Sequence, residues 1–229
     1  MPSLPPIVVF DLDGTLAETA GDLVGTLNAI LEQEGLKPLP LENARDMIGA
    51  GAKALIQRGF SAAGEDLDSA RLERLFAEFL DHYGRNICIH SHLYPGVLTA
   101  LDELSERGFR LAVCTNKVEV HAVELLTLLG VAGRFTAICG RHTFPFFKPD
   151  PRHITMTVEQ AGGDPARAVM VGDSRADIDA AKAAGMPVVG VTFGYTDTPV
   201  DALGATRVIS HYDDLVEAVT AVVPLGAAA

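Results

Sequence analysis

The chain has 229 residues, of which 48% are hydrophobic, and a formal net charge of −12. This length suits one full domain with a smaller insertion, and the acidity argues against binding of nucleic acid or an anionic membrane through a basic face. No apolar run reaches the length of a membrane span, about 18 residues. We therefore expect a cytoplasmic protein with no nucleic-acid or membrane partner, whose state as monomer or homodimer the sequence leaves open.

The first expected element is a buried strand over residues 7–10, which ends in two carboxylates. Asp11 and Asp13 lie two residues apart on an extended chain, so both side chains can reach the same side of the backbone. Like charges this close are unfavourable unless a cation lies between them, and Mg²⁺ is a hard ion that proteins bind through carboxylates together with phosphate oxygens. The strand end is therefore a candidate magnesium site, although Asp-Gly is also a common turn dipeptide.

A helical segment follows over residues 18–88. Apolar residues such as Leu23 and Leu27 recur there at helical spacing, and the segment carries no convincing strand pattern. This predicts a helical insertion after the first strand, with hinges near residues 16–19 and 87–92. The same spacing would also suit a lateral helical layer of one domain.

From about residue 90 onward, expected strands and helices alternate. This rhythm predicts an α/β fold with a doubly wound parallel sheet, covered by helices on both faces. The strands are expected at residues 109–114, 136–139, 168–171, 188–191 and 207–209, and the helices at residues 93–107, 118–129, 151–161, 173–184 and 213–222.

Further polar side chains stand at or near the ends of these strands. The carboxyl ends of parallel strands meet along one edge of an open α/β sheet, where such folds place their ligands. Carboxylates, a hydroxyl and a lysine gathered there have the composition of a metal-assisted phosphoryl-transfer site. Besides the aspartates of the first strand, the set comprises Thr115, Asn116, Lys148, Asp173, Ser174 and Asp177.

These motifs, in this order over nearly the whole chain, resemble those of the haloacid dehalogenase (HAD) superfamily of aspartate-nucleophile phosphatases, and within it the phosphoglycolate phosphatases. The stretch from Gly172 to Gly185 is part of that likeness. The resemblance implies a Rossmann-like α/β core over residues 1–17 and 89–229. It also implies a small all-α cap, over residues 18–88, that lies above the active site.

The resemblance, together with the charges, implies a role for each polar residue. Asp11 is the expected nucleophile, which forms an aspartyl-phosphate. Asp13 is the expected proton donor and acceptor, because crowding by neighbouring carboxylates favours its protonated state. Thr115 and Lys148 are expected to hold and neutralise the phosphate oxygens, and Mg²⁺ would be bound by Asp11, by Asp13 through its backbone carbonyl, and by Asp173. Three further residues are expected to support the site: Asn116, Ser174 and Asp177.

The expected substrate is a small phosphorylated metabolite, most of all 2-phosphoglycolate, whose carboxylate needs a cation or backbone amides in the cap. Gly49 and Gly51 form a loop that lets amides approach a ligand, and Arg45, Lys53 and Arg58 flank it. Lys53 is the preferred partner because it is close to the loop, although each cation could equally be a solvated surface charge. The alternatives are a phosphatase for a sugar phosphate, a nucleotide or pyrophosphate, and a sugar phosphomutase.

Overall fold

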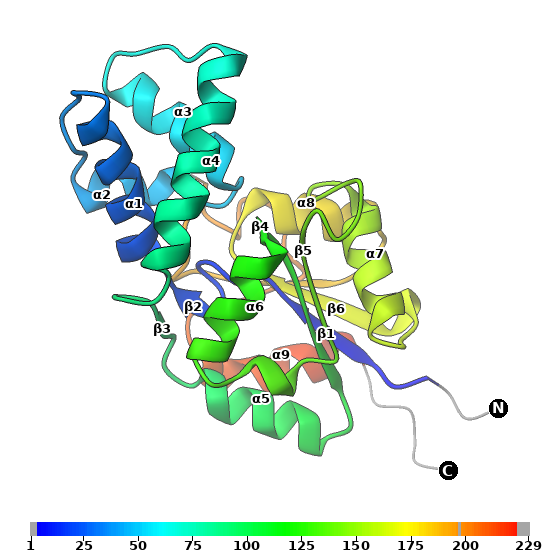
Figure 1. Cartoon of the computed structure of the whole chain (residues 1–229). Helices are drawn as coiled ribbons and strands as arrows, with labels where there is room; N and C mark the ends of the chain where they lie inside the picture. Colours follow the sequence, from blue (N-terminus) through cyan, green and yellow to red (C-terminus); the bar gives the residue numbers. More distant parts are fainter. Residues whose placement is uncertain (1–3, 197, 224–229) are drawn as a thin grey trace.

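The core of the described chain is a six-stranded parallel sheet (Figure 1). The structure is a computed structural model that describes residues 4–196 and 198–223. The strand order is β5-β4-β1-β6-β7-β8, so the first strand lies inside the sheet between β4 and β6. The strands are β1 (Ile7–Phe10), β4 (Arg110–Val118), β5 (Ala137–Arg141), β6 (Ala168–Gly172), β7 (Val188–Val191) and β8 (Arg207–Ile209).

Helices cover both faces of this sheet. Helices α7 and α8 bury their apolar residues against one face, and α5, α6 and α9 bury theirs against the other (Figure 1). Their bounds are α5 (Val97–Glu106), α6 (Glu119–Leu128), α7 (Pro151–Gln160), α8 (Arg175–Ala183) and α9 (Leu215–Val222).

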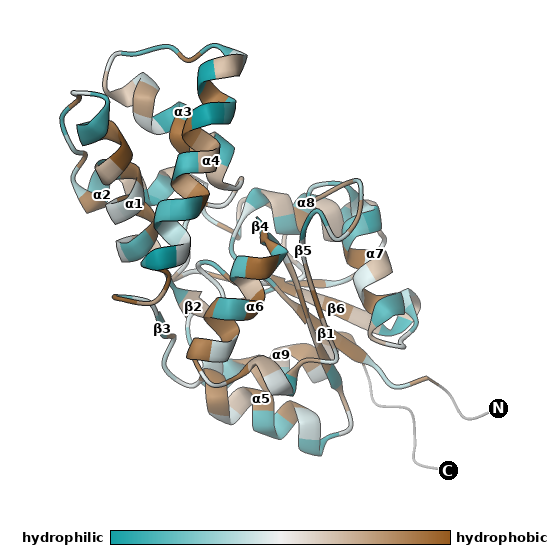
Figure 2. Ribbon diagram, in the orientation of Figure 1, coloured by the Kyte–Doolittle hydropathy of each residue, from teal (hydrophilic) through white to brown (hydrophobic). Residues whose placement is uncertain are grey.

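The unbroken apolar run of β1 follows from this double cover. Ile7 and Val9 belong to the core on the α7 and α8 side, whereas Val8 and Phe10 belong to the core on the opposite side. Side chains alternate between the faces of a strand, so a strand covered on both faces needs an apolar residue at every position. Figure 2 shows the strands of the sheet mainly in brown.

A group of helices lies beyond the carboxyl ends of the strands, between β2 and β3 (Figure 1). The two short strands pair antiparallel, where the chain leaves the core and returns to it. They coincide with the segments where hinges are expected, although the sequence does not predict the strands themselves. The bounds are α1 (Ala20–Gln33), α2 (Leu41–Ala44), α3 (Ala52–Ala62), α4 (Ser69–Arg85), β2 (Ala17–Glu18) and β3 (His92–Leu93).

The expected fold class, a doubly wound α/β core with a helical cap, is confirmed, and several helices begin later than predicted, among them α5 and α8. Helix α5 begins after Gly96, which has a left-handed φ of 85°, so the chain from residue 93 is not yet helical. Helix α8 begins after Ser174, whose side chain caps its first turn together with Asp177. In the described part of the chain, no helix is long and apolar enough to cross a membrane.

Strand β4 is longer than the sequence predicts. The apolar pattern ends at residue 114, yet after an irregularity in register the strand continues until Val118 pairs with Arg141 of β5. Thr115 and Asn116, both buried, therefore lie within the strand, near its carboxyl end, rather than in a loop after it. The strand pairs with β5 at Cys114 before them and at Val118 after them.

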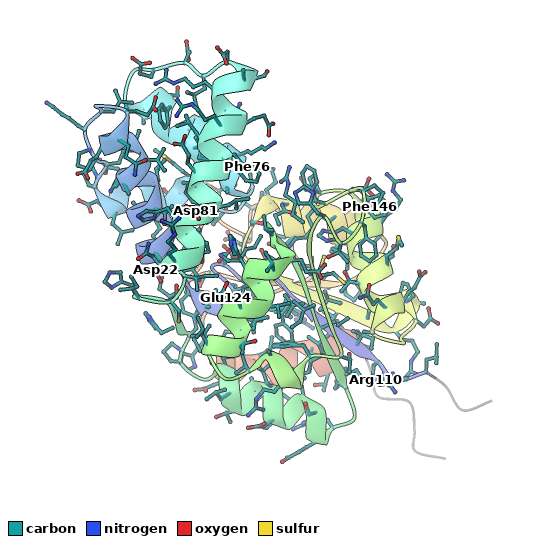
Figure 3. The ribbon with its side chains drawn as sticks, viewed as in Figure 1. Asp22, Phe76, Asp81, Arg110, Glu124 and Phe146 are labelled. Atoms are coloured by element: carbon teal, nitrogen blue, oxygen red, sulfur yellow. The ribbon has the colours of Figure 1, made fainter. Side chains whose placement is uncertain are left out.

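Asp22 fastens the start of the cap to its return segment. This buried carboxylate of α1, labelled in Figure 3, accepts hydrogen bonds from the backbone N–H groups of Ile89 (3.1 Å), His90 (3.0 Å) and Ser91 (2.9 Å), and from Ser91 Oγ (2.6 Å). A carboxylate that satisfies several backbone donors makes charge-assisted hydrogen bonds, which are stronger than neutral ones. Asp22 thus ties the segment where the chain enters the cap to the segment where it returns to the core.

We expect Asp22→Ala to lower the free energy of unfolding by about 2–4 kcal/mol, because it leaves several donors unpaired in a partly buried segment. Urea unfolding measures this. The matched control is Asp81→Ala on α4, also labelled in Figure 3, whose carboxylate is exposed and pairs only with Arg85 of the same helix among the described residues; it should cost less than about 0.5 kcal/mol. Equal effects of the two substitutions would contradict the role of Asp22.

Candidate active site

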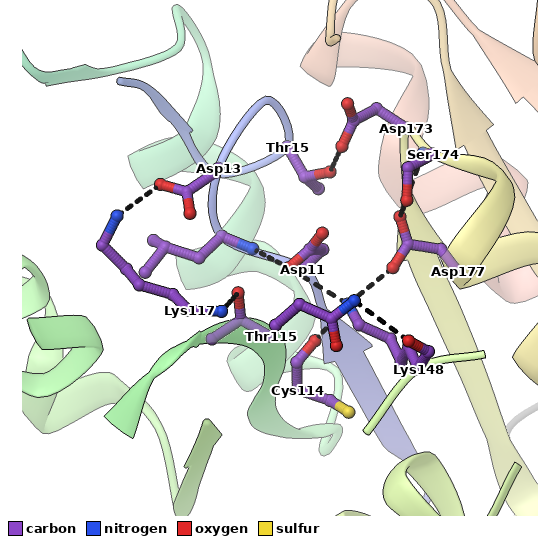
Figure 4. A network of polar contacts seen from close by, with 12 residues as sticks. Asp11, Asp13, Thr15, Cys114, Thr115, Lys117, Lys148, Asp173, Ser174 and Asp177 are labelled. Carbon is purple, nitrogen blue, oxygen red and sulfur yellow. Dashed lines mark hydrogen bonds and ion pairs between the residues drawn. The ribbon is translucent and has the colours of Figure 1, made fainter. Parts of the chain in front are cut away.

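Side chains from separate segments meet at the carboxyl end of β1 (Figure 4). Asp11 directly follows β1, Thr115 lies in β4, and Asp173 directly follows β6. Because β4 and β6 flank β1 in parallel, their ends bring these side chains to one place. Lys148 comes from the segment before α7 and reaches the same place, where its ammonium contacts Asp11.

Buried acidic side chains crowd together here. Asp11, Asp173 and Asp177 are 4%, 1% and 0% exposed, and each offers a carboxylate oxygen within 4.8 Å of the others. Lys148 lies among them, with Nζ at 3.1 Å from Asp11 Oδ1 and 2.6 Å from Asp177 Oδ1. Three carboxylates and one ammonium would leave two negative charges out of reach of water.

The pKa values reflect this surplus of negative charge. Burial, followed by the charge of Asp177, raises the pKa of Asp11 to about 7. Burial, Asp177 and Asp11 also raise the pKa of Asp173 well above its usual range. Burial opposes the charge on Lys148, but Asp11 and Asp177 outweigh it and raise the pKa of the ammonium. The lysine is therefore charged, and the carboxylates need a further cation to be fully ionised together.

Asp173 is held in place from two sides. It accepts hydrogen bonds from Thr15 Oγ1 and from the backbone N–H of Tyr195, both at 2.7 Å. The chain at Gly194 passes so close that a Cβ there would lie 2.2 Å from the Asp173 Cβ, so only glycine allows this approach. These contacts fix the carboxylate beside Asp11.

Asp177 positions Lys148 and caps a helix. Its Oδ2 accepts from the N–H (3.0 Å) and Oγ (2.6 Å) of Ser174, which closes the first turn of α8, while Oδ1 contacts the ammonium of Lys148. Asn116 Nδ2 donates to the backbone carbonyl of Lys148 at 3.0 Å. Asp177 already has the Lys148 ammonium as its counter-charge at 2.6 Å, whereas Asp173 contacts no cation among the described residues and Asp11 contacts Lys148 only through Oδ1. Asp11 and Asp173 are therefore the side chains better placed to bind a further cation.

Asp13 has different surroundings from those expected. Its Oδ1 accepts from Thr19 Oγ1 and from the buried ammonium of Lys117, both at 2.8 Å, and it does not belong to the cluster of acidic groups given above. The carboxylates that crowd one another are Asp11, Asp173 and Asp177. The closest charge to Asp13 is thus a cation, because the side chain turns away from β6 toward β4.

A small cavity, of about 50 Å³, joins this site to the cap. Its lining includes Asp11, Asp13 and Thr115 from the core, and Gly49, Gly51 and Lys53 from the cap; Ile48, Leu55, Phe76 and Phe79 supply apolar surface. Phe76 is labelled in Figure 3, on the α4 side that faces the core. The Lys53 ammonium forms an ion pair at 2.5 Å with Glu73 of α4 and lies over the Phe76 ring.

The other two cations expected near the glycine loop lie elsewhere. Arg45 forms an ion pair with Glu18 at 2.5 Å and lies over the ring of Tyr195, in a hollow apart from the cavity that holds Asp11. Arg58 donates to the Met47 carbonyl and lines a third hollow. Of the three expected cations, the structure therefore brings only Lys53 into the cavity with the aspartates.

The structure also brings in residues that the sequence reasoning does not include. Lys117 could have been found, because residues 115 and 117 share one face of an extended strand. Arg141 ends β5 and lines the cavity, a position that strand order alone reveals. Tyr195 contacts Asp173 through its backbone and Glu18 through its hydroxyl at 2.5 Å, and no local pattern marks it.

Comparison with known proteins bears directly on this arrangement. Residues 8–191 match the model of the haloacid dehalogenase-like hydrolase family. The chain belongs to this family. It is 49% identical over 210 residues to a phosphoglycolate phosphatase of Mesorhizobium japonicum (92% of each chain) and 46% identical over 211 residues to one of Caulobacter vibrioides (92% of this chain and 89% of that one). These matches make it a phosphoric monoester hydrolase.

Solved structures agree. A predicted phosphoglycolate phosphatase from Haemophilus somnus is similar with a TM-score of 0.86 and 32% identity, over 93% of this chain and 97% of that one. CbbY from Rhodobacter sphaeroides in complex with phosphate is similar with a TM-score of 0.73 and 25% identity, over 92% of this chain and 96% of that one. The expected family and enzyme class are confirmed.

The raised pKa of Asp11 makes the stability of the metal-free protein depend on pH. Folding raises this pKa from 3.8 to about 7, so the folded state holds the proton more tightly than the unfolded state. The resulting stabilisation is complete below pH 4 and is lost as the pH rises to about 7, by up to about 4 kcal/mol. Asp11→Asn cannot lose this proton, so its advantage over wild type should grow between pH 4 and pH 8 in a chelator, as measured by urea unfolding. A difference that stays constant over this pH range would contradict the assignment.

Proposed function

We propose that the protein is a magnesium-dependent phosphatase that acts through an aspartyl-phosphate on Asp11. One observation carries the proposal: the buried surplus of negative charge at the end of β1, where Asp11 meets Asp173 and Asp177 with only Lys148 to balance them. A nucleophilic carboxylate must be ionised to attack, and an anionic phosphate must nevertheless approach it. Both conditions require a further cation.

The donor atoms fit Mg²⁺. Carboxylate oxygens of Asp11 and Asp173, with the backbone carbonyl of Asp13, are hard ligands of the kind that Mg²⁺ prefers. A divalent ion would also balance the two surplus charges of the cluster. When bound, Mg²⁺ would neutralise phosphate oxygens and make the phosphorus more electrophilic.

The contacts of Asp11 indicate which oxygen attacks. Its Oδ1 accepts from the backbone N–H of Leu12 at 2.7 Å and contacts Lys148, so we assign the attack on phosphorus to Oδ2. The bond between phosphorus and the leaving oxygen then breaks, and the phosphoryl group remains on Asp11. Lys148 neutralises charge on the phosphate, and Thr115, which lines the same cavity, donates to a phosphate oxygen.

Asp13 would move the protons. In the first step a protonated Asp13 donates to the leaving alkoxide, and in the second step its carboxylate takes a proton from the water that attacks the aspartyl-phosphate. Lys117 and Thr19 both contact Oδ1, which holds the carboxyl group in one orientation and leaves the proton transfers to Oδ2.

We further propose that residues 18–88 act as a cap on a core formed by residues 1–17 and 89–229. The cap loop at Gly51 closes on the core, because a Cβ there would lie 3.4 Å from the Asn116 carbonyl oxygen. A cavity closed in this way suits a compact phosphomonoester. The relatives named phosphoglycolate phosphatase support 2-phosphoglycolate as the substrate.

The intermediate is tested directly by trapping it. With a ³²P-labelled aryl phosphate, whose good leaving group needs no proton donor, and an acid quench, the wild type should carry label on the protein within the first turnover. Asp13→Asn should then accumulate more label, because its hydrolysis step is slow. Asp11→Asn should carry none and lose activity by about 10⁴-fold or more while remaining folded. Label retained on the Asp11→Asn protein would contradict Asp11 as the nucleophile.

Metal and substrate are tested together with a panel of phosphomonoesters. A chelator should abolish activity and Mg²⁺ restore it, whereas excess Ca²⁺ should inhibit through its looser, higher coordination. In Mg²⁺, phosphoglycolate should give the highest kcat/KM. If a hexose phosphate or nucleotide gave a tenfold higher kcat/KM, phosphoglycolate would not be the substrate, but the protein would still be a phosphatase. Full activity in the chelator would contradict the metal requirement.

A further inference from the structure

Arg141 is a cation in the cavity that the mechanism above does not use. It is the last residue of β5, beside the end of β4, and its side chain is half-buried. Its guanidinium lies 3.7 Å from the centre of the Phe147 ring. It lines the same cavity as Asp11 and Thr115.

Arg141 lacks an anionic partner among the described residues. Burial alone lowers the pKa of its guanidinium, and no carboxylate offsets this effect. The other cations that line the cavity are already paired: Lys117 with Asp13 and Lys53 with Glu73. A partly desolvated guanidinium without a counter-charge is unfavourable unless an anion arrives.

The position of Arg141 suits a short substrate. Its Nη1 and the backbone carbonyl oxygen of Asn116 both lie within 3.4 Å of the point that a Cβ on Gly51 would occupy. Arg141 is therefore close to the strand end that carries Thr115, where the phosphate is proposed to bind. A phosphate and a carboxylate separated by one carbon atom fit so small a separation.

A second polar group in the cavity also lacks a partner. The hydroxyl of Tyr83, on α4, is fully buried and makes no hydrogen bond within the described part of the chain. Burial, the largest influence, raises the pKa of Tyr83 to about 12, so the phenol keeps its proton and remains a donor. Tyr83 lines the cavity together with Arg141, and its ring lies beside the Lys117 ammonium.

We propose that Arg141, a residue of the core rather than of the cap, binds the carboxylate of the substrate and selects phosphomonoesters that carry a second anionic group. The guanidinium presents paired N–H donors that match the two oxygens of a carboxylate. The inference rests on the proposed function, because it assigns the second anionic subsite of that same active site. It differs from the expectation that Lys53 receives this carboxylate.

The test compares 2-phosphoglycolate with ethyl phosphate, which has the same carbon skeleton without the carboxylate. In Arg141→Met the ratio of the two kcat/KM values should fall by about 30-fold or more, as for loss of a buried charged partner, while kcat/KM for ethyl phosphate changes less than threefold. The matched control is Arg152→Met, because Arg152 also lies over a phenylalanine ring, that of Phe146, but is exposed and pairs with Asp150. In Arg152→Met the ratio of the two kcat/KM values should not change.

Lys53→Met discriminates between the two candidate cations. We expect it to leave the ratio within about threefold of wild type, and unchanged activity of each variant on ethyl phosphate reports that the site is intact. The inference is overturned if Arg141→Met keeps the wild-type ratio, or if only Lys53→Met loses it. If the wild type hydrolysed neither ester, the proposed function would be contradicted, and the inference with it. If the wild type favours phosphoglycolate, the proposed function stands whatever the result for Arg141→Met.

Discussion

The crowding of three buried carboxylates around one ammonium is the constraint on which the site depends. Asp11, Asp173 and Asp177 share the end of β1 with Lys148, and such a cluster is stable only if protons or a cation balance its charge. The same imbalance explains why a dianionic substrate would need a divalent metal to approach a nucleophilic carboxylate. One electrostatic condition thus links the stability of the site to its proposed chemistry.

The fold creates this cluster by placing β1 between β4 and β6. Parallel pairing aligns the ends of the three strands, and the sheet is covered on both faces, so the carboxylates emerge from an apolar surface that excludes water. The helical cap closes the remaining side through the loop at Gly51. It supplies mostly apolar surface, while the charged groups come mainly from the core, including Lys117 and Arg141.

Much of this could be predicted from the sequence, because strands buried on both faces leave continuous apolar runs and the site residues come directly after them. Asp11 and Asp173 were found in this way. Lys117 contacts Asp13 across 104 positions of sequence, and a strand that continues past its apolar segment hides that geometry. To predict Arg141 one must know that β4 and β5 are neighbours in the sheet. To predict the pairing of Lys53 with Glu73 one must know that α3 packs on α4. Neither arrangement leaves a local pattern in the sequence.

The most direct test of the electrostatic claim is the number of protons released when Mg²⁺ binds. Calorimetric titration in buffers of different ionisation enthalpy measures it. If the cluster holds protons until a cation displaces them, binding should release protons at pH 6.5, and the release should fall as the pH rises past about 7, because Asp11 is then already ionised. Saturable binding without proton release at pH 6.5, or no binding at all, would contradict the account.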